Sequence, residues 1–497
     1  MRTSYPILPF AAILLLAALP TAAFASADLP TEFLITDHGA VGDGTTVNTK
    51  AIQGTIDACS AAGGGVIVVS RGVFLSGALF FKPGVSLEVR EDAVLKSTHD
   101  MADFPPVYTN WEGVERYWTS GFLNFIGVND ISVSGEGTID GSGLEFPGQG
   151  PRGQGPRGRG ARGRGPGAGP GAPGARRGPP PSAAPPGPLP KVEDVYPSPL
   201  PTVDTLNFAP DPAHLPPINA AGILVPGGFG GRLSPPRSVV FQNCSNIRVY
   251  GLHLKNQAKW GFVFLYCKNV IAEDLTVSVD SYIPSSDGMD ICSSQNVRVT
   301  GCNIMCTDDD ISIKAGKDED GLRVNRPTDN VTISDCTFGS GSGVAMGSEV
   351  SGSIRHVLVQ RCKFIGSDTV ARIKSQPSRG GEIDDIVFRD LQLQNVGRAI
   401  DIELSWRMVG PMPPPAKVLT TLTRVRLINV SGTARSAGTI QGFKDKPVKD
   451  VTFENCKVTA ERGLVIQYAP ELNTSGLDIT VAEGQPIIHQ GAAPQPQ

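Results

Sequence analysis

The stretch that decides the fold runs from residue 246 to residue 314: NIRVYGLHLKNQAKWGFVFLYCKNVIAEDLTVSVDSYIPSSDGMDICSSQNVRVTGCNIMCTDDDISIK. Within it, an asparagine followed by alternating apolar residues occurs three times, as NIRV at Asn246, NVIA at Asn269 and NVRV at Asn296. Further copies share a polar first residue and begin at Asp130, Asn330, His356, Asp385, Arg424 and Asp450. From residue 246 onward the spacing lies between 23 residues (246 to 269) and 39 residues (385 to 424), with most values in the twenties.

Strand-like repeats at such a period are typical of a solenoid, in which each repeat buries its apolar face against its neighbours. We predict an all-β chain folded as a single-stranded right-handed parallel β-helix. A closed immunoglobulin-like sandwich is the alternative, but it would not repeat a polar residue at one ladder position so persistently. One amphipathic helix precedes the repeats, because Ile52, Ile56 and Cys59 share a face between a capping Asn48 and the Gly63–Gly64 pair. We expect this helix to cover the open end of the solenoid.

The composition agrees with many short strands, since aromatic residues make up 6% of the 497 residues while Gly (59) and Pro (42) are abundant. The net charge of −4 gives no broad electrostatic reason to expect nucleic-acid or membrane binding. Residues 1–27 read as a secretory signal peptide, with a positive start, an apolar run and small residues at the cleavage-type positions. We expect a secreted or periplasmic protein without a membrane span.

The chain divides into few regions. Residues 28–485 are predicted to form one catalytic β-helix domain. Within it, residues 146–192 are rich in Gly, Pro and Arg and cannot bury enough apolar surface to order, so we predict a disordered insertion. Residues 486–497 are predicted to be a disordered tail. The nine cysteines lack a paired CxxC pattern, so a zinc site is not expected, and most should be small buried side chains. Cys302 and Cys306 are close enough in sequence to pair as an alternative.

A second short strand in each repeat carries the polar residues of interest. The predicted inward-facing reference residues of five consecutive repeats are Ile291, Ile313, Met346, Ile373 and Ile402. With a period of two, the residues on either side point away from the core, towards solvent. One place before the reference lie Asp290, Ser312, Ala345, Arg372 and Asp401, and one place after lie Cys292, Lys314, Gly347, Lys374 and Glu403. Four places before it lie Asp287, Asp309 and Ser342.

This alignment stacks Asp287 and Asp309 on successive coils, with Asp308 beside them. Crowded carboxylates raise the pKa of at least one member, which can then remain protonated as a general acid while its neighbours act as bases. Glycoside hydrolysis requires such a pair around the scissile bond. Arg372 and Lys374 would offer positive charge to a substrate carboxylate, and Arg379 could assist from the following turn. Trp406 and Trp260 could stack on sugar rings or simply pack.

The chain resembles the polygalacturonase family, the family 28 glycoside hydrolases, from about residue 33 to residue 480 apart from the insertion. The resemblance is carried by ITDHGAVGDGTTVNTKAIQGTIDAC (35–59), GTIDGSG (137–143) and PPRSVVFQNCSNIRV (235–249). Four diagnostic motifs follow: NTD appears as SSD ending at Asp287, GDD as TDD with Asp308 and Asp309, GHG as GSG (341–343), and RIK is intact at 372–374.

The resemblance implies an inverting hydrolase of acidic pectic polysaccharide that needs no metal or cofactor. By position, Asp308 resembles the general acid, and Asp287 and Asp309 resemble the carboxylates that activate water. Arg372 and Lys374 resemble the residues that bind the galacturonate carboxylate next to the scissile bond. Inversion predicts roughly 6.5–9.5 Å between acid and base carboxyl groups.

One motif departs from the family, because Ser342 stands where polygalacturonases have a histidine. We predict that Ser342 contacts substrate, together with Trp406. The departure could indicate exo action, or specificity for rhamnogalacturonan or a decorated pectin. A polysaccharide lyase and a non-catalytic carbohydrate-binding β-helix are the rival classes. We expect a monomer.

Overall fold

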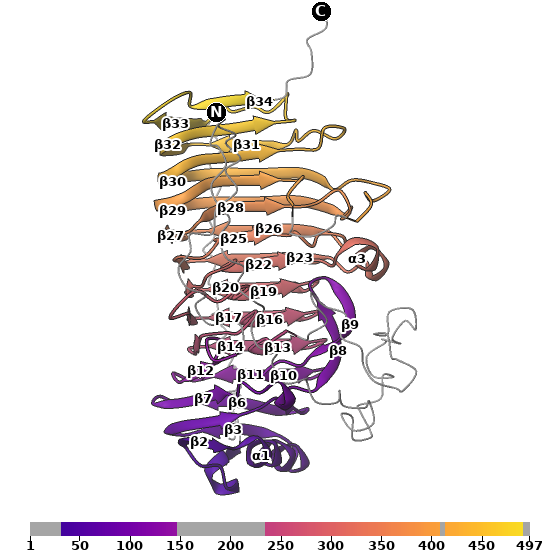
Figure 1. Ribbon diagram of the computed structural model, residues 1–497, viewed down its shortest axis with the longest axis vertical. Coiled ribbons are helices and arrows are strands. Elements are labelled where there is room, and N and C mark those ends of the chain that lie inside the picture. Colours follow the sequence, from indigo (N-terminus) through magenta and orange to yellow (C-terminus); the bar gives the residue numbers. More distant parts are fainter. Residues whose placement is uncertain (1–30, 147–233, 408–412, 491–497) are drawn as a thin grey trace, which may run out of the picture.

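A computed structural model describes residues 31–146, 234–407 and 413–490 of the chain. Parallel strands wind into coils that stack along the long axis of the molecule, with the earliest coils at one end and the latest at the other (Figure 1). Each described coil contributes strands to three columns, and each column pairs in register from one coil to the next. The predicted signal segment and most of the predicted insertion lie outside the described residues.

The column that carries the predicted catalytic residues is called the site column. It contains β5 (Leu79–Phe81), β10 (Leu123–Ile126), β13 (Val239–Gln242), β16 (Phe262–Leu265), β19 (Met289–Cys292), β22 (Ile311–Lys314), β25 (Val344–Met346) and β28 (Thr369–Lys374).

The repeats that begin with a polar residue form the ladder column. It contains β1 (Glu32–Leu34), β3 (Gly65–Val69), β6 (Val85–Val89), β11 (Asn129–Ser134), β14 (Ser245–Tyr250), β17 (Lys268–Glu273), β20 (Gln295–Thr300), β23 (Thr328–Ser334), β26 (Ile354–Gln360) and β31 (Val451–Glu454).

The third column contains β2 (Asp43–Val47), β4 (Gly72–Ser76), β7 (Ala93–Ser97), β12 (Thr138–Asp140), β15 (His253–Lys255), β18 (Thr276–Ser278), β21 (Asn303–Met305), β24 (Thr337–Phe338), β27 (Lys363–Ile365) and β33 (Leu477–Val481). Longer strands pass through more than one column in the last coils: β29 (Glu382–Glu403), β30 (Thr421–Gln441) and β32 (Cys456–Gln467).

The helix α1 (Thr49–Ala61) covers the first coil, as the amphipathic pattern predicts, and buries Ile52, Ile56 and Cys59 (Figure 1). Asn48 precedes it, but its side chain does not cap the helix. Its Oδ1 instead accepts a hydrogen bond from the N–H of Val41 at 2.7 Å. Short 3₁₀ turns occur as η1 (Ile35–His38) and η2 (Met101–Asp103).

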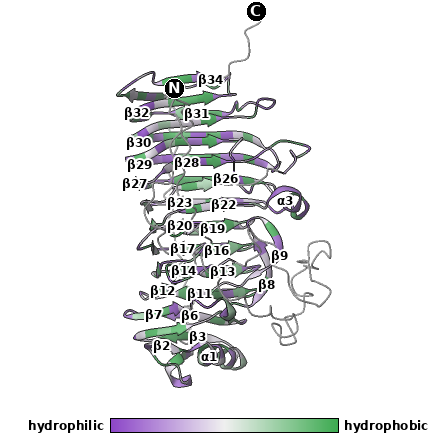
Figure 2. Ribbon diagram, in the orientation of Figure 1, coloured by the Kyte–Doolittle hydropathy of each residue, from purple (hydrophilic) through white to green (hydrophobic). Residues whose placement is uncertain are grey.

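Apolar side chains from all three columns fill the interior of the solenoid, and the strands alternate between apolar and polar residues along their length (Figure 2). In the site column, Phe81, Phe125, Phe241 and Phe264 form one continuous stack, with ring centroids 4.1, 4.8 and 5.2 Å apart. Such contacts contribute about 0.5–1.5 kcal/mol each beyond the area they bury. All nine cysteines are buried and free, so Cys302 and Cys306 do not pair.

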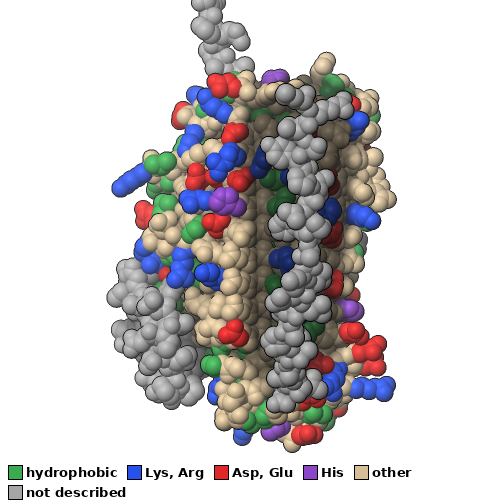
Figure 3. Space-filling model, turned by 180° about the vertical axis from the view of Figure 1, so that it is seen from behind, with side chains coloured by type: hydrophobic (Ala, Val, Ile, Leu, Met, Phe, Trp, Pro, Cys, Tyr) green, Lys and Arg blue, Asp and Glu red, His purple; other side chains and the backbone are tan. Residues whose placement is uncertain are grey.

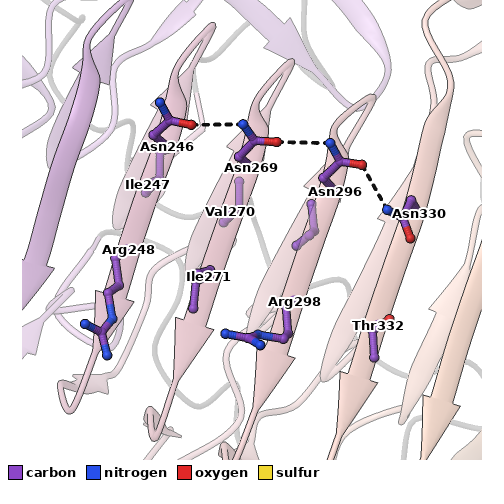
Figure 4. A pocket seen from close by; sticks show the side chains of 11 residues that line it. Asn246, Ile247, Arg248, Asn269, Val270, Ile271, Asn296, Arg298, Asn330 and Thr332 are labelled. Atoms are coloured by element: carbon purple, nitrogen blue, oxygen red, sulfur yellow. Dashed lines mark hydrogen bonds between the residues drawn. The ribbon is translucent and has the colours of Figure 1, made fainter. Parts of the chain in front are cut away.

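The repeated polar residue has a conformational cause. Asn246, Asn269, Asn296 and Asn330 all have φ between 55° and 58°, a left-handed backbone that asparagine tolerates better than most residues. Each side chain also donates a hydrogen bond to the corresponding residue of the preceding coil, at 2.8–3.0 Å. Figure 4 shows the bonds among the asparagines themselves. The pattern that revealed the repeat is therefore a turn requirement combined with a hydrogen-bonded asparagine ladder.

Three features differ from the sequence expectations or were not anticipated. The predicted tail begins too early, because β34 (Ile487–Gln490) pairs with β32 and extends the solenoid beyond residue 485. The acidic segment that starts at Asp318 forms the short helix α3 (Asp318–Val324). An antiparallel hairpin of β8 (Pro106–Trp111) and β9 (Val114–Thr119) lies outside the three columns. Within the described residues, no helix is long and apolar enough to cross a membrane.

Candidate active site

The predicted alignment of the site column is confirmed residue by residue. Ile291 pairs with Ile313, Ile313 with Met346, Met346 with Ile373 and Ile373 with Ile402. The turns that precede these strands are also in register, since the N–H of Gly288 donates to the carbonyl of Asp309 at 3.0 Å. Asp287 and Asp309 therefore occupy equivalent places on consecutive coils.

The prediction that the outward neighbours face solvent is wrong for the middle of the column. Asp290, Ser312 and Ala345 point away from the core and yet are 0% exposed. These outward-facing side chains form a second buried layer outside the apolar core. The β8–β9 hairpin reaches this layer through Trp111, which stacks on Trp260 next to Lys314, and the charge of Glu349 acts on both Lys314 and Asp290. Electrostatic interactions are stronger in such a buried layer, so each charged side chain there needs a partner.

Asp309 has its partners on two strand positions of β28. Its Oδ1 accepts from Arg372 Nη1 at 2.9 Å, and its Oδ2 accepts from Lys374 Nζ at 2.6 Å. Burial alone would raise the pKa of Asp309, but Lys374 and Arg372 outweigh it and hold the pKa at about 2. The charged form of Asp309 is therefore favoured by its two cationic partners.

Asp308 differs from its neighbour in exposure and charge. Its side chain is partly exposed, and its Oδ1 accepts the N–H of Asp309 at 3.0 Å. Burial and the adjacent charge of Asp309 raise the pKa of Asp308. Two adjacent carboxyl groups with pKa values moved in opposite directions are the arrangement that separates a proton donor from a base.

Asp287 is almost fully buried beside Lys314, whose Nζ donates to its Oδ2 at 3.2 Å. The same Nζ lies 2.5 Å from Asp290 Oδ1. Burial raises the pKa of Asp287 well above its ordinary value, and the Lys314 ammonium opposes that rise. Burial likewise raises the pKa of Asp290, to about 6.

The two remaining predicted substrate contacts border this cluster. Ser342 is half-buried, and its N–H donates to the carbonyl of Asp308 at 2.7 Å, so it lies directly against the predicted acid. Trp406 is partly exposed, and Lys374 Nζ lies 5.4 Å from its ring centroid. The structure therefore brings all seven predicted site residues into one neighbourhood.

Arg379 does not join them, and the suggestion that it assists at the substrate carboxylate is wrong. Its side chain is 0% exposed, pairs with Asp318 at the start of α3, and donates to the carbonyl of Ser348 at 2.9 Å. Arg379 instead fastens α3 and the Ser348 turn to the solenoid.

The hairpin is the part of the site that sequence reasoning missed. Trp111 at the end of β8 stacks on Trp260 of the solenoid, with centroids 5.3 Å apart and an interplanar angle of 17°. Trp260 in turn lies over Lys314, whose Nζ is 3.7 Å from its centroid. A signal for the hairpin is present in the sequence, since aromatic residues occur on both sides of the turn, at 108 and 111 and again at 117 and 118. The turn residues Glu112 and Gly113 both have positive φ in the structure (47° and 82°).

Buried polar groups anchor the hairpin to the coils. Arg237 donates to the carbonyl of Asn110 at 3.1 Å and to Thr109 Oγ1 at 3.0 Å. Tyr266 donates to Glu115 at 3.0 Å, and Arg323 of α3 donates to the other oxygen of Glu115 at 2.7 Å. The hairpin thus seals the outward face of β13 and β16, immediately before the carboxylates.

Two surface hollows are lined by other residues. One, of about 570 Å³, follows the asparagine ladder between Asn246 and Asn330 (Figure 4). Another, of about 440 Å³, lies between Asp368 and Arg435. Neither is lined by a predicted catalytic residue. The face seen in Figure 3 intersperses acidic and basic side chains and has no single charged field. Among the residues that the structure describes, no group of three or more His, Cys, Asp or Glu side chains is arranged to hold a metal ion.

Comparison with known proteins agrees with this geometry. The family model described as "Glycosyl hydrolases family 28" matches residues 230–474. The chain belongs to this family. An exo-poly-alpha-D-galacturonosidase of Dickeya chrysanthemi is 27% identical over 76% of the chain and 58% of its own length. A probable polygalacturonase of Vitis vinifera is 23% identical over 73% of the chain and 60% of its own length. The chain thus spans about three fifths of these relatives.

Solved structures show the same fold. A hyperthermoactive exopolygalacturonase from Thermotoga maritima has a TM-score of 0.64 at 22% identity, and the match covers 93% of this chain and 94% of that one. The family 28 exopolygalacturonase of Yersinia enterocolitica has the same TM-score at 19% identity, covering 93% of this chain and 77% of that one. The right-handed parallel β-helix predicted for this family 28 chain is thereby confirmed.

Proposed function

We propose that this family 28 chain hydrolyses α-galacturonosidic bonds in an acidic pectic polysaccharide with inversion at the anomeric carbon. The observation that carries the proposal is that the pKa values of the adjacent Asp308 and Asp309 are moved in opposite directions, while the backbone N–H of Asp309 donates to Asp308 Oδ1. A carboxyl group whose protonated form is favoured, next to one whose charged form is favoured, can supply both the acid and the base of glycoside hydrolysis.

In this mechanism Asp308 protonates the glycosidic oxygen as the bond to the anomeric carbon breaks. A water molecule attacks that carbon from the opposite face, and its proton passes to Asp309 or Asp287. Arg372 and Lys374 bind the carboxylate of the sugar next to the scissile bond, Ser342 contacts substrate beside the acid, and Trp406 packs on a sugar ring. The relatives named as galacturonosidase and polygalacturonase support galacturonate as that sugar.

Exo action is the mode that the hairpin favours. The outward face of the coils before the carboxylates is covered: Val240 and Val263 are buried (2% and 0% exposed), and the hairpin is held to the same coils through Gln242 and Tyr266. A polysaccharide lying along the site column therefore has room on one side of the scissile bond and little on the other. Cleavage close to a closed end releases short products.

Product analysis on homogalacturonan, rhamnogalacturonan and xylogalacturonan tests this proposal. We expect one or two galacturonate units from homogalacturonan while the polymer shortens slowly. A rapid fall in polymer length contradicts exo action. Preferred cleavage of rhamnogalacturonan would instead identify a rhamnogalacturonan hydrolase, the second candidate, which is favoured by Ser342 at the position of the family histidine. Unsaturated products that absorb ultraviolet light would identify a lyase, and binding without turnover a carbohydrate-binding β-helix. Export, implied by residues 1–27, is tested by recovery of a shortened chain outside the cytoplasm.

A further inference from the structure

Lys314 is a buried cation in the middle of the site. Its side chain is 7% exposed and contacts two carboxylates and one indole ring. A solvated lysine would lose most of its hydration on moving there, and charged side chains are almost never fully buried without partners. The partners of Lys314 therefore indicate what the burial is for.

We propose that Lys314 is a positioning residue that fixes the Asp287 carboxylate for catalysis as the counter-ion it shares with Asp290. The proposal rests on the proposed function, because it assigns Lys314 a task only if Asp287 assists the attack of water. Three contacts carry it: Nζ to Asp287 Oδ2 at 3.2 Å, Nζ to Asp290 Oδ1 at 2.5 Å, and Nζ to the Trp260 centroid at 3.7 Å.

The group of a lysine, an aspartate and a tryptophan around Lys314 resembles the group around Lys374. Lys314 and Lys374 occupy equivalent positions in β22 and β28, two coils apart, with Gly347 between them. Each lysine bonds one aspartate of the Asp287–Asp309 pair, and each lies near one tryptophan. Both lysine side chains are nearly buried, at 7% exposed for Lys314 and 10% for Lys374, but their aromatic neighbours differ. Trp260, next to Lys314, is itself stacked on Trp111, whereas Trp406, next to Lys374, is partly exposed. We therefore assign Lys314 to the carboxylates of the protein and Lys374 to the substrate.

The charges around Lys314 explain why one cation suffices. It faces Asp287 on the turn before β19, Asp290 and the Cys292 thiol on β19, and Glu349 on the turn after β25. Burial alone would lower the pKa of Lys314, but Asp290 and Asp287 outweigh it and raise the pKa well above its ordinary value. Lys314 stays an ammonium, so the two aspartates compete for a single positive charge. The bond to Asp290 is the shorter one, which leaves the Asp287 carboxylate incompletely neutralised and able to accept a proton.

Opposite substitutions test this arrangement by the pH dependence of kcat. In Lys314→Met, Asp287 loses its cation, and we expect kcat to fall about 100-fold while KM changes less than about threefold. The acidic limb of the kcat profile should move to higher pH by about one unit or more. In Asp290→Asn, the ammonium belongs to Asp287 alone, and the acidic limb should move to lower pH. Lys314→Arg keeps the charge and should recover part of the lost rate.

Thermal unfolding of each variant separates positioning from simple stabilisation. If Lys314→Met and Asp290→Asn both lower Tm and kcat without moving the acidic limb in opposite directions, the proposal is wrong. If Lys314→Met does not fold, Asp290→Asn and Lys314→Arg still give the pH shift or its absence. Failure of the proposed function is recognised separately, because Asp308→Asn would then keep full hydrolytic activity.

Discussion

The backbone N–H of Asp309 donates to the carboxylate of Asp308 at 3.0 Å, which fixes two neighbouring aspartates whose pKa values are moved in opposite directions. The cause lies in their partners. Asp309 is held by Arg372 and Lys374 from β28, whereas Asp308 remains partly exposed and faces the charge of Asp309. The cationic residues of β28, two coils away, thereby give the neighbouring Asp308 and Asp309 opposite pKa shifts.

Replacing Asp308 by asparagine tests its role as the proton donor. The amide side chain retains an oxygen that can accept the Asp309 N–H, so we expect normal folding and substrate binding. Reducing-sugar release should fall by about 10²–10⁴-fold, the usual contribution of a positioned general acid. Asp130→Asn, on the exposed ladder column, is the matched control and should keep its activity. Full activity in Asp308→Asn would contradict the assignment.

Stability in acid should depend on the ion pairs of Asp309. Its pKa in the folded chain is about 2, below the ordinary value of 3.8, so these pairs stabilise the fold above pH 4 and lose their effect as the pH falls through 2. Lys374→Met removes the shorter pair and raises the pKa of Asp309. We expect Tm to begin its acid decline at a higher pH in this variant.

The measurement is Tm between pH 2 and pH 6. The exposed Lys363 of β27 offers a control, since Lys363→Met changes the same charge at the surface and should leave the shape of the curve unaltered. Identical curves for Lys374→Met and the unmodified chain would show that the pairs do not control acid stability.

The hairpin should determine product length. Arg237 is 1% exposed and bonds the carbonyl of Asn110 and the hydroxyl of Thr109, so Arg237→Met releases β8 from the solenoid. We expect longer oligogalacturonides and faster polymer shortening, with a lower Tm. Arg248→Met provides the comparison, because Arg248 is 57% exposed on the ladder column. An unchanged product profile in a folded Arg237→Met variant would show that the hairpin does not determine exo action.

The asparagine ladder should contribute measurable stability. Asn269 donates to Asn246 at 2.9 Å, accepts from Asn296 at 3.0 Å, and has a φ of 58°. Asn269→Ala loses both bonds and places alanine in a left-handed conformation, so we expect about 1–3 kcal/mol of destabilisation in urea unfolding. Asn269→Gly loses the same bonds without the steric strain and should lose less. Equal losses in the two variants would contradict the conformational part of this explanation.

Much of this fold is predictable from the sequence, because in a β-helix residues that lie one repeat apart in sequence lie side by side on neighbouring coils. The alternation of Met289, Asp290 and Ile291 gives the direction of each side chain, and the repeat gives the coil on which it lies. The alignment of Asp287 with Asp309 therefore followed from counting residues.

The partners of Lys314 were not predictable in the same way. Its burial depends on Trp111, which comes from a hairpin 203 residues earlier whose position on the coils has no periodic signal. The outward-facing side chains of the site column are predicted to contact solvent, because the alternation of apolar and polar residues shows only whether a side chain points into the solenoid or out of it. A second covering layer arises from specific anchors, such as Arg237 and Glu115, that pair with residues far away in the sequence.

The pairing of β10 with β13, β11 with β14 and β12 with β15 has an evolutionary consequence. Residues 147–233 separate these strands along the chain, yet the rungs on either side meet as immediate neighbours. New sequence can therefore be acquired at a turn without shifting the registry of any later coil. The length of the segment between these rungs therefore leaves the spacing of Asp287 and Asp309, which lie on later coils, unchanged.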